Sequence, residues 1–402
     1  MLPSYILFGV SFLLIIYSYV GYPILLSLLS YLFPRPTRSA DITPRISLII
    51  TARNEEKCIR AKLVNSLSLD YPREKLEIIV ASDASTDRTD QIVQSFSDLG
   101  VILHREDRHY GKTITQSRAV KKSTGEILIF SDATTHYDHH ALRAIVRQFA
   151  DPEVGCVAGQ LVYLTPNATA VGKGCSSYWN YEKIVKHFES QLGSLIGVSG
   201  CLYAVRRSCH ARLSDDMIDD FVIASEIRMQ GLRTVYERTA IAFEETNQEH
   251  RDEFMMRVRI IKQTLGALSR YRSLFSWRHN LSYSFQMISH KIMRYLVPFF
   301  LITVFASNLV LVGEHPIFEF TFMAQLALYS MALAGWELNN LGFRRLGPLA
   351  FPYYFLLVNT AVLIAILKSI MGERYVIWEP IREAEKQKIE TINQFRNIKS
   401  EI

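Results

Sequence analysis

Residues 127–135 read ILIFSDATT, an apolar run that ends in an aspartate and two threonines. A short apolar run of this kind is typical of a strand that is buried on both faces of a parallel sheet. Related segments come earlier, with strands expected at 46–50, 76–81 and 101–103 and helices expected at 55–69, 89–96 and 112–122. Because short apolar strands alternate with helices, the sequence predicts a doubly wound α/β domain.

Polar residues follow the ends of these strands. Thr51, Asp83 and Asp132 each lie at or just past a strand end. Ligands of open α/β sheets bind beyond the carboxyl ends of the strands. We therefore expect these residues to share one site, where carboxylates can hold a nucleotide and a cation.

Apolar segments flank this domain. Residues 5–33 carry no charge and are long enough to cross a bilayer, and Pro23 predicts a kink within them. The arginines that follow, Arg35, Arg38 and Arg45, place the next domain in the cytoplasm by the positive-inside rule. The predicted organisation is an N-terminal transmembrane helix at 1–34, the α/β domain at 44–250, amphipathic interfacial helices at 251–294, three transmembrane helices at 295–371 and a polar tail at 372–402. An ordinary soluble helix pair is the alternative for 254–294.

Bulk composition narrows the class of protein. Hydrophobic residues make up 49% of the 402 residues, which fits a mixed membrane and soluble chain. A net charge of +6 is too weak and dispersed to indicate a nucleic-acid partner. The five cysteines show no C-x-x-C spacing and are expected to be reduced and structural. Four spans would leave the basic tail outside, so either one run is re-entrant or interfacial, or the tail breaks the charge rule.

The motifs near the strand ends have both functional and structural interpretations. Asn54 can help to fix a base or ribose, or can cap a helix. Asp83 can accept a hydrogen bond from a uracil N–H. For Asp87, a role as a ligand and a role as the helix cap that follows a turn are equally supported. Lys112, after Gly111, opens a helix and can meet a phosphate, or can be a solvent-exposed lysine.

The remaining acidic and basic motifs are also ambiguous. An Asp-x-Asp motif after a strand would chelate a divalent cation, but here Thr134 stands where the second acid would be, and His136 or Asp138 are substitutes or loop residues. The adjacent Asp219 and Asp220 can supply a general base or cap a helix. Of Arg257 and Arg259, which lie two positions apart, at most one is expected to point into the site, and lipid headgroups are the rival partner.

The order and spacing of these motifs resemble those of glycosyltransferase family 2 over nearly the whole chain. The resemblance is carried by Val20-Gly21-Tyr22-Pro23, Asn54-Glu55, Asp83-x-Ser85-x-Asp87, Gly111-Lys112, Asp132-Ala133-Thr134, Val198-Ser199-Gly200, Asp219-Asp220 and Trp378-Glu379-Pro380. The plan is similar to that of membrane synthases of hyaluronan, chitin and poly-N-acetylglucosamine. It implies a GT-A domain, a doubly wound α/β fold that binds a UDP-sugar and a divalent cation, Mg²⁺ or Mn²⁺.

The resemblance also implies roles for individual residues. The nucleotide-binding residues it implies are Thr51, Ala52, Arg53, Glu55, Asp83, Lys112, Asp132 and Arg259. Asp83 reads uracil, Asp132 is the surviving acid of the metal motif, and Asp220, with Asp219 beside it, takes the place of the catalytic base. Ser199 and Gly200 lie where the family lines its acceptor cleft.

We therefore expect an inverting glycosyltransferase, anchored in the bacterial inner membrane, that moves a sugar from a nucleotide sugar to a lipid-linked or envelope glycan acceptor. Processive members of the family carry Gln-x-x-Arg-Trp on the interfacial helix, and the matching residues 256–260 read MRVRI. The loss of the glutamine and tryptophan makes a processive polysaccharide synthase the alternative. A non-catalytic scaffold that has kept the fold is a second alternative, motivated by Thr134.

Overall fold

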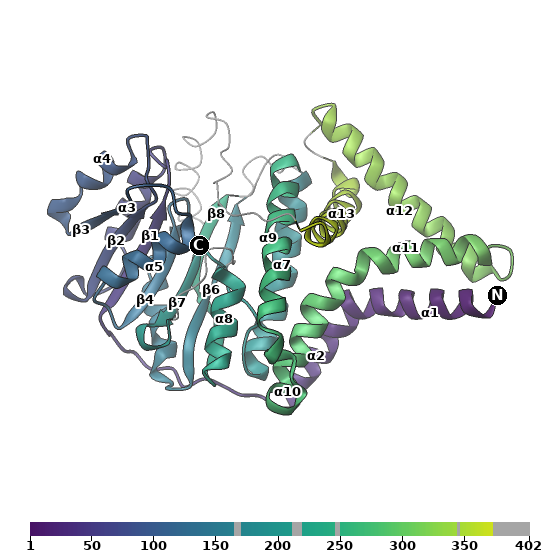
Figure 1. Cartoon of the computed structure of the whole chain (residues 1–402), viewed down its shortest axis with the longest axis horizontal. Helices are drawn as coiled ribbons and strands as arrows, with labels where there is room; N and C mark the ends of the chain where they lie inside the picture. The colour runs from purple at the N-terminus through teal and green to yellow at the C-terminus, as the bar shows by residue number, and fades with distance from the viewer. Residues whose placement is uncertain (165–169, 211–218, 246–249, 344–345, 373–402) are drawn as a thin grey trace.

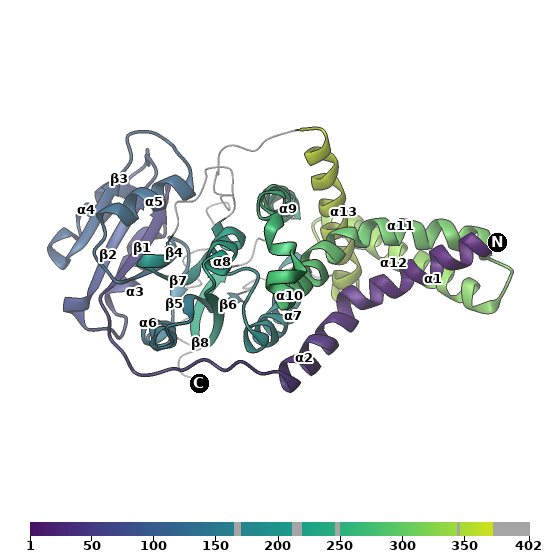
Figure 2. The same ribbon diagram turned by 60° about the horizontal axis from the view of Figure 1, so that its bottom comes forward.

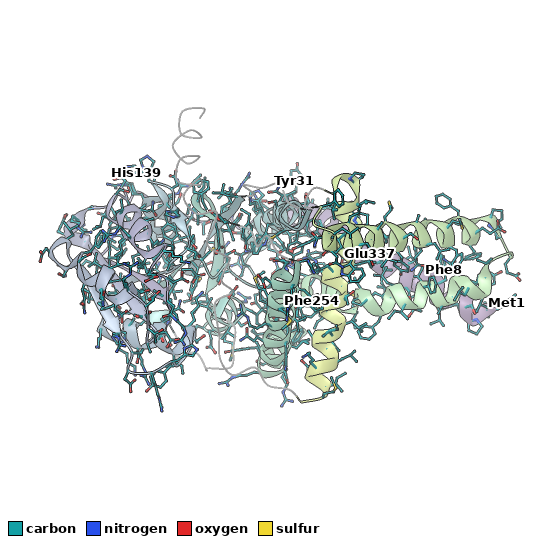
Figure 3. The ribbon with its side chains drawn as sticks, turned by 90° about the horizontal axis from the view of Figure 1, so that it is seen from above. Met1, Phe8, Tyr31, His139, Phe254 and Glu337 are labelled. Carbon is teal, nitrogen blue, oxygen red and sulfur yellow. The ribbon has the colours of Figure 1, made fainter. Side chains whose placement is uncertain are left out.

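The computed structural model describes residues 1–164, 170–210, 219–245, 250–343 and 346–372 (Figure 1). The molecule is elongated, with His139 of the α/β domain toward one end and Met1 and Phe8 of the apolar helices toward the other (Figure 3). The predicted polar tail and its Trp378-Glu379-Pro380 motif lie outside the described residues.

The α/β domain is built on one eight-stranded sheet with the order β3-β2-β1-β4-β7-β6-β8-β5. Its strands are β1 (Ile46–Ala52), β2 (Leu76–Ser82), β3 (Val101–Arg105), β4 (Ile127–Asp132), β5 (His136–Tyr137), β6 (Val154–Leu164), β7 (Leu202–Arg206) and β8 (Arg233–Glu245). Strands β3, β2, β1 and β4 are parallel, whereas β7 runs antiparallel to both β4 and β6. The four predicted strands are confirmed, and together they form the parallel half of this sheet.

Helices cover both faces of the sheet. The helices of this domain are α3 (Ile59–Leu67), α4 (Thr89–Gln94), α5 (Lys112–Lys122), α6 (Ala141–Val146), α7 (Ala170–Leu192) and α8 (Asp219–Met229). Leu48 and Ile50 of β1 join one core cluster, while Ile49 between them joins a second. Because side chains alternate across a strand, a strand covered on both faces is buried at every position, as β1 is, and most of its residues are apolar. All five cysteines are buried thiols, and none of them is in a disulfide.

Among the residues that the structure describes, four helical segments are long and apolar enough to cross a membrane: Leu2–Leu32, Leu281–Leu311, Pro316–Asn340 and Gly347–Ile370. The first contains α1 (Leu2–Ile16), a π-helical turn (Tyr17–Gly21) and α2 (Tyr22–Leu32). The chain bends between α1 and α2 (Figure 2), as expected from Pro23, and the π-helical turn lies at the bend.

The later apolar segments contain α10 (Trp277–Gln286), a π-helical turn (Met287–Ile292), α11 (Met293–Leu311), α12 (Pro316–Asn340) and α13 (Ala350–Ile370). The stretch from Leu281 to Leu311 is one continuous helix, so nothing interrupts the chain at the expected boundary between residues 294 and 295.

Helix α9 (His250–Arg270) joins the α/β domain to the apolar helices. Its Val258 and Ile261 pack against α13 at Ala361 and Val362. Nearer the C-terminal end of α9, Ala267 and Leu268 share a hydrophobic cluster with Phe221 and Val222 of α8. The helix is amphipathic, as its sequence predicts, but its apolar residues contact other helices of the same chain. Its position at a membrane surface stays a prediction.

Candidate active site

Strand register brings the predicted strand-end residues together. Strand β1 lies between β2 and β4, and Thr51 is paired with Ala81 on one side and Asp132 on the other. The backbone N–H of Asp83 donates to the carbonyl oxygen of Ala52 at 3.0 Å. Thr51, Ala52, Asp83 and Asp132 therefore meet at the carboxyl edge of the sheet, where ligands of α/β folds bind.

The carboxylate of Asp83 is buried and holds the loop before α5. It accepts hydrogen bonds from the backbone N–H groups of Tyr110 at 2.8 Å and Gly111 at 2.9 Å. The ring Nδ1 of His109 lies 2.6 Å from the same carboxylate, whose side chain is 0% exposed. In this structure Asp83 orders residues 109–111, and its role in reading uracil stays a prediction.

The loop that Asp83 holds aims Lys112 into the site. Gly111 has φ +91° and ψ 160°, a backbone conformation that is essentially restricted to glycine, and α5 starts at the next residue. From this first turn, the Nζ atom of Lys112 reaches Asp132 Oδ1 at 2.7 Å. The lysine is therefore fixed in the site as an ion-pair partner of Asp132 and is not a free surface cation.

Gly200 lets Asp220 approach Lys112. A Cβ atom added at Gly200 would lie 3.3 Å from Asp220 Oδ1 and 3.4 Å from Lys112 Nζ, closer than most real Cβ contacts. The loop is tied to α8 by a hydrogen bond from Val198 N to Asp220 O at 2.9 Å. The structure thus brings Lys112, Asp132, Gly200 and Asp220 together. The side chain of Asp219 lies outside the described part of the chain.

Ser199 is buried and bonded to a lysine that the sequence analysis missed. Lys186 of α7 donates from Nζ to Ser199 Oγ at 2.9 Å. Burial lowers the pKa of Lys186, and nearby carboxylates, including Asp220, act in the opposite direction. No local sequence pattern around Lys186 indicates that this lysine is buried beside Ser199, because a lysine within a long helix is usually expected at the surface. The contact of Ser199 with an acceptor stays a prediction.

Glu244 lies near Asp132 and is a second acid of the candidate site. The sequence analysis did not identify it. Strand β5 pairs antiparallel with β8, His136 opposite Phe243, which sets Glu244 beside the turn after β4. Thr134 Oγ1 lies 3.4 Å from Glu244 Oε1. Burial, and then the charge of Asp132, raises the pKa of Glu244 to about 7. Two adjacent glutamates at the end of an apolar strand were the available sequence signal.

A buried lysine lies beneath this pair of acids. Lys62 of α3 is 0% exposed, donates to the carbonyl oxygen of Thr135 at 2.7 Å and lies over the Tyr137 ring. Burial lowers the pKa of Lys62 to about 7, although Asp132 favours its charged form. The lysine therefore supports the turn that follows β4 from inside the domain.

The oxygen atoms near Asp132 fit a hard divalent cation. Asp132 and Glu244 offer carboxylates and Thr134 offers a hydroxyl, the ligand types that Mg²⁺ and Mn²⁺ prefer. Within the described residues, no group of three or more His, Cys, Asp or Glu side chains is arranged to hold a metal ion. A cation here would need further oxygens from a substrate, as is usual for Mg²⁺ bound with a diphosphate. Asp138 accepts instead from His140 N at 3.0 Å in a turn.

The loop after β1 is tied to the loop after β2. Arg53 Nη1 donates to the carbonyl oxygen of Asp83 at 2.8 Å, and Glu55 N donates to Thr89 Oγ1 at 2.7 Å. The interpretation of Asn54 as a helix cap is wrong, because its side-chain oxygen accepts from Thr86 N at 2.7 Å and α3 starts only at Ile59.

Asp87 is a turn residue in this structure. Its carboxylate accepts from Thr89 N at 2.9 Å and from Glu56 N at 3.1 Å.

Two polar atoms of the candidate site, Thr51 Oγ1 and His109 Nε2, are buried and have no hydrogen-bond partner among the described residues. Buried polar atoms are seldom left unpaired, so these two are available to a polar ligand.

The arginines of α9 face different directions, because two residues rotate a helix by about 200°. Arg257 is committed to its own helix and to α13, with 2.9 Å from Nε to Glu253 Oε1 and 2.7 Å from Nη2 to the Tyr354 hydroxyl. Arg259 is half-buried on another side of α9. The role of Arg259 toward a diphosphate stays a prediction.

Comparisons with known proteins agree with the fold of this chain. The family model for glycosyl transferase family 2 matches residues 47–213. The mannosyltransferase PcManGT of Pyrobaculum calidifontis, solved with GDP-mannose and Mn²⁺, superposes with a TM-score of 0.69 over 92% of this chain and 100% of that chain, at 22% identity. At this identity the superposition shows the fold alone.

Curated relatives match part of the chain. Probable glycosyltransferase YdaM of Bacillus subtilis is 28% identical over 197 residues, 46% of each chain. Beta-monoglucosyldiacylglycerol synthase of Synechocystis is 29% identical over 35% of this chain and 32% of that protein. Poly-beta-1,6-N-acetyl-D-glucosamine synthase of Staphylococcus aureus is 24% identical over 52% of each chain. The chain thus spans about half the length, or less, of these relatives.

Proposed function

We propose that this chain, which carries a glycosyl transferase family 2 domain on a GT-A fold, transfers a sugar from a nucleotide sugar to an acceptor at a membrane, with inversion at the anomeric carbon. The observation that carries the proposal is the convergence of Lys112, Asp132 and Asp220 around Gly200. One cation and two carboxylates at a sheet edge can hold a diphosphate and remove a proton.

The donor in this proposal is a UDP-sugar. Thr51 Oγ1 and His109 Nε2 are the buried polar atoms available to the base and ribose, and Arg53 holds the adjoining loop in place. PcManGT was solved with GDP-mannose, so a guanine nucleotide is the first competitor to test.

The proposed cofactor is a divalent cation, held by Asp132 with Glu244 and the Thr134 hydroxyl close by. Mn²⁺ in PcManGT supports this choice. When bound, the cation would offset the negative charge of the diphosphate. Lys112, paired with Asp132, supplies a second positive charge from the protein itself.

The proposed base is Asp220. Its carboxylate accepts the proton of the acceptor hydroxyl while that oxygen attacks the anomeric carbon, and the bond from that carbon to the diphosphate oxygen breaks. Attack from the face opposite the nucleotide converts an α-linked donor into a β-glycoside. Lys112 stabilises the charge that grows on the departing diphosphate.

The proposed acceptor is a lipid-linked or cell-envelope glycan, and the proposed location is the bacterial inner membrane with the α/β domain in the cytoplasm. Four helices of suitable length and composition and a relative named as a glycolipid synthase support this. A processive polysaccharide synthase is the alternative, favoured by the poly-N-acetylglucosamine synthase relative. Product length separates the two, because a ladder of long chains would overturn the version that adds one or a few sugars.

The test uses the detergent-purified full-length protein, a panel of UDP-sugars and GDP-mannose, and Mn²⁺ or Mg²⁺. We expect nucleotide release with one donor and a ~10²–10⁴-fold lower rate in Asp220→Asn, with nucleotide affinity retained. Asp98→Asn, on an exposed turn, is the matched control and should behave as the wild type. Absence of any nucleotide binding would overturn the transferase and favour a scaffold.

A further inference from the structure

One face of α7 carries three charged residues, Glu182, Lys186 and Glu189, spaced by four and then three positions. This spacing places their side chains one above the other along the helix. All three are buried, and even Lys186 is only 8% exposed. Because charged side chains are seldom buried without a partner, the partners of each residue indicate what it does.

The two glutamates are paired with helices of the apolar segments. Glu189 accepts a hydrogen bond from the Tyr22 hydroxyl at 2.8 Å and lies 2.7 Å from His290 Nδ1. Glu182 is paired with Arg294 and lies 3.2 Å from Nε2 of the same histidine. Burial raises the pKa of Glu182, but Arg294 and His290 outweigh it and hold that pKa well below its usual value. The two carboxylates therefore tie α7 to two different apolar segments.

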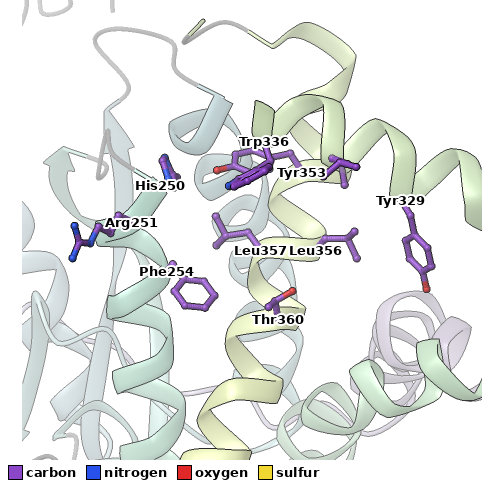
Figure 4. Close-up of a pocket in the computed structure, with 11 residues that line it drawn as sticks. His250, Arg251, Phe254, Tyr329, Trp336, Tyr353, Leu356, Leu357 and Thr360 are labelled. Carbon is purple, nitrogen blue, oxygen red and sulfur yellow. The ribbon is translucent and has the colours of Figure 1, made fainter. Parts of the chain in front are cut away.

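Helix α7 is also packed closely against α13. A Cβ atom added at Gly174 would lie 2.4 Å from Cγ of Tyr354, so the glycine lets the two helices approach. Other residues of α13, Leu356 and Leu357 among them, line a groove of about 630 Å³ between α9, α12 and α13 (Figure 4). The described residues that line this groove include none from α7. The contacts of α7 thus fix it in place without involving the groove.

Lys186 is turned toward the candidate active site. Its Nζ atom donates to Ser199 Oγ at 2.9 Å and lies 5.3 Å from the centre of the Trp179 ring. Ser199 is its only hydrogen-bond partner among the residues that the structure describes. The lysine therefore connects the fixed helix α7 to the loop that precedes β7.

This loop receives Asp220 on either side of the residue that Lys186 holds. The backbone N–H of Val198 donates to the carbonyl oxygen of Asp220 at 2.9 Å. A Cβ atom added at Gly200 would lie 3.3 Å from Asp220 Oδ1, so the carboxylate lies close against this glycine. Ser199, between the two, is held by Lys186. A shift of Ser199 would therefore move both contacts with Asp220.

We propose that Lys186 is a positioning residue for the proposed base, because its hydrogen bond to Ser199 fixes the loop against which the Asp220 carboxylate lies. The inference rests on the proposed function and adds a residue to its mechanism. A general base must lie within hydrogen-bond reach of the proton that it removes, and a misplacement of about 1 Å can cost ~10²-fold in rate. Lys186 makes no described contact with Lys112 or Asp132, so donor binding does not depend on it.

The first test compares turnover with donor binding in Lys186→Met, which keeps the length of the side chain and removes its charge. The detergent-purified full-length protein is assayed with the donor that supports nucleotide release in the wild type. We expect kcat to fall ~10–10²-fold, with the donor KM, the UDP affinity in calorimetry and the melting temperature unchanged. An unchanged kcat, or a parallel loss of UDP affinity, would overturn the proposal.

Lys183→Met is the matched control for this test. Lys183 lies on the same helix, and its Nζ atom donates to Asn180 Oδ1 at 3.2 Å, away from the loop. The control should keep the wild-type kcat. An equal loss of kcat in both variants would overturn the proposal, because it would show a general effect of charge on α7.

A double-mutant cycle tests whether Lys186 acts through Ser199. Ser199→Ala leaves a buried ammonium group without its partner, whereas the double variant Lys186→Met/Ser199→Ala removes both groups. We expect kcat of the double variant to be no lower than that of the slower single variant. Losses of kcat that multiply would overturn the proposal, because Lys186 would then act by another route.

Hydrogen exchange tests the loop without any turnover. The Val198 N–H bonds to Asp220 O, so its protection reports this contact directly. We expect faster exchange of residues 197–200 in Lys186→Met than in the wild type or in Lys183→Met. Unchanged exchange would overturn the proposal.

The outcomes separate this inference from the proposed function. Nucleotide release that is lost in Asp220→Asn but unchanged in Lys186→Met would keep the transferase and remove the role of Lys186. Absence of nucleotide binding in the wild type would remove the transferase and with it the catalytic meaning of the contact, even if exchange becomes faster in Lys186→Met.

Discussion

The loops after β2 and β4 each carry an aspartate at the same edge of the sheet, but they use its carboxylate differently. Asp83 is 0% exposed and accepts from two backbone N–H groups beside His109. Asp132 is 28% exposed, pairs with Lys112 and lies close enough to Glu244 to raise its pKa. One carboxylate orders a loop, and the other is partly exposed and paired with a lysine of the candidate active site.

This difference shows that a strand-end aspartate can serve the site indirectly. Asp83 fixes Gly111, Gly111 starts α5, and α5 delivers Lys112 to Asp132. The two loops are therefore consecutive parts of one arrangement. Substitutions in each loop should therefore show whether activity is lost because the loop before α5 is no longer ordered or because a group at the reacting phosphate is missing.

Among substitutions that test the comparison of these two loops, the largest effect is expected for Asp132→Asn. The substitution removes the charge that partners Lys112 and that would hold the cation, so kcat/KM should fall by ~10²–10³-fold. The melting temperature should stay close to that of the wild type, because the side chain is partly exposed. Retention of activity would contradict the placement of Asp132 at the reacting phosphate.

Asp83→Asn should lower the stability of the protein. An amide keeps one oxygen and adds a donor facing Gly111 N–H, so the free energy of unfolding should fall by about 2–3 kcal/mol. Denaturant unfolding and nucleotide affinity are measured together. A selective loss of UDP binding at unchanged stability would instead support direct reading of uracil.

Gly111→Ala should strain the turn that Asp83 holds. With φ at +91°, a side chain there should cost about 1–3 kcal/mol. Space is not the reason, since nothing lies within 4 Å of an added Cβ atom. We expect weaker nucleotide binding in calorimetry, whereas Gly231→Ala, also at positive φ but on a turn remote from this loop, should lose stability without changing nucleotide affinity.

Glu244→Gln should have the smallest effect of the four. It keeps the shape of the side chain but removes its charge near Asp132, so Mn²⁺ affinity should fall about tenfold. Titration of Mn²⁺ into the purified protein with bound nucleotide measures this directly. The neighbouring Glu245→Gln is the control, and equal losses in both variants would argue for a general charge effect.

Local sequence predicted the fold well. The apolar strands and the helix at 112–122 were found at their places, the predicted GT-A fold is confirmed, and the family model for glycosyl transferase family 2 matches residues 47–213 within it. These features depend on residues that are close in sequence, where buried strands and glycine turns leave a clear pattern.

The sequence analysis did not identify three residues of the candidate site, Glu244, Lys62 and Lys186, and there is a physical reason for this. Glu244 reaches Asp132 only through the antiparallel pairing of β5 with β8, more than a hundred residues away. Lys62 and Lys186 are polar residues on helices, where a solvent-exposed position is the usual expectation. Their burial depends on tertiary packing that no local pattern records, and this is also why the capping role of Asn54 was wrong.

Helix α9 touches both halves of the molecule, and this has a thermodynamic consequence. Ala267 and Leu268 pack on Phe221, the residue after Asp220, while Val258 and Ile261 pack on α13, which lies in a segment long and apolar enough to cross a membrane. Any ligand that binds more tightly to one position of α9 than to another must shift the helix toward that position. Linkage is reciprocal, so two ligands that favour the same position of α9, one at the candidate active site and one among the apolar helices, would tighten each other's binding by the same factor.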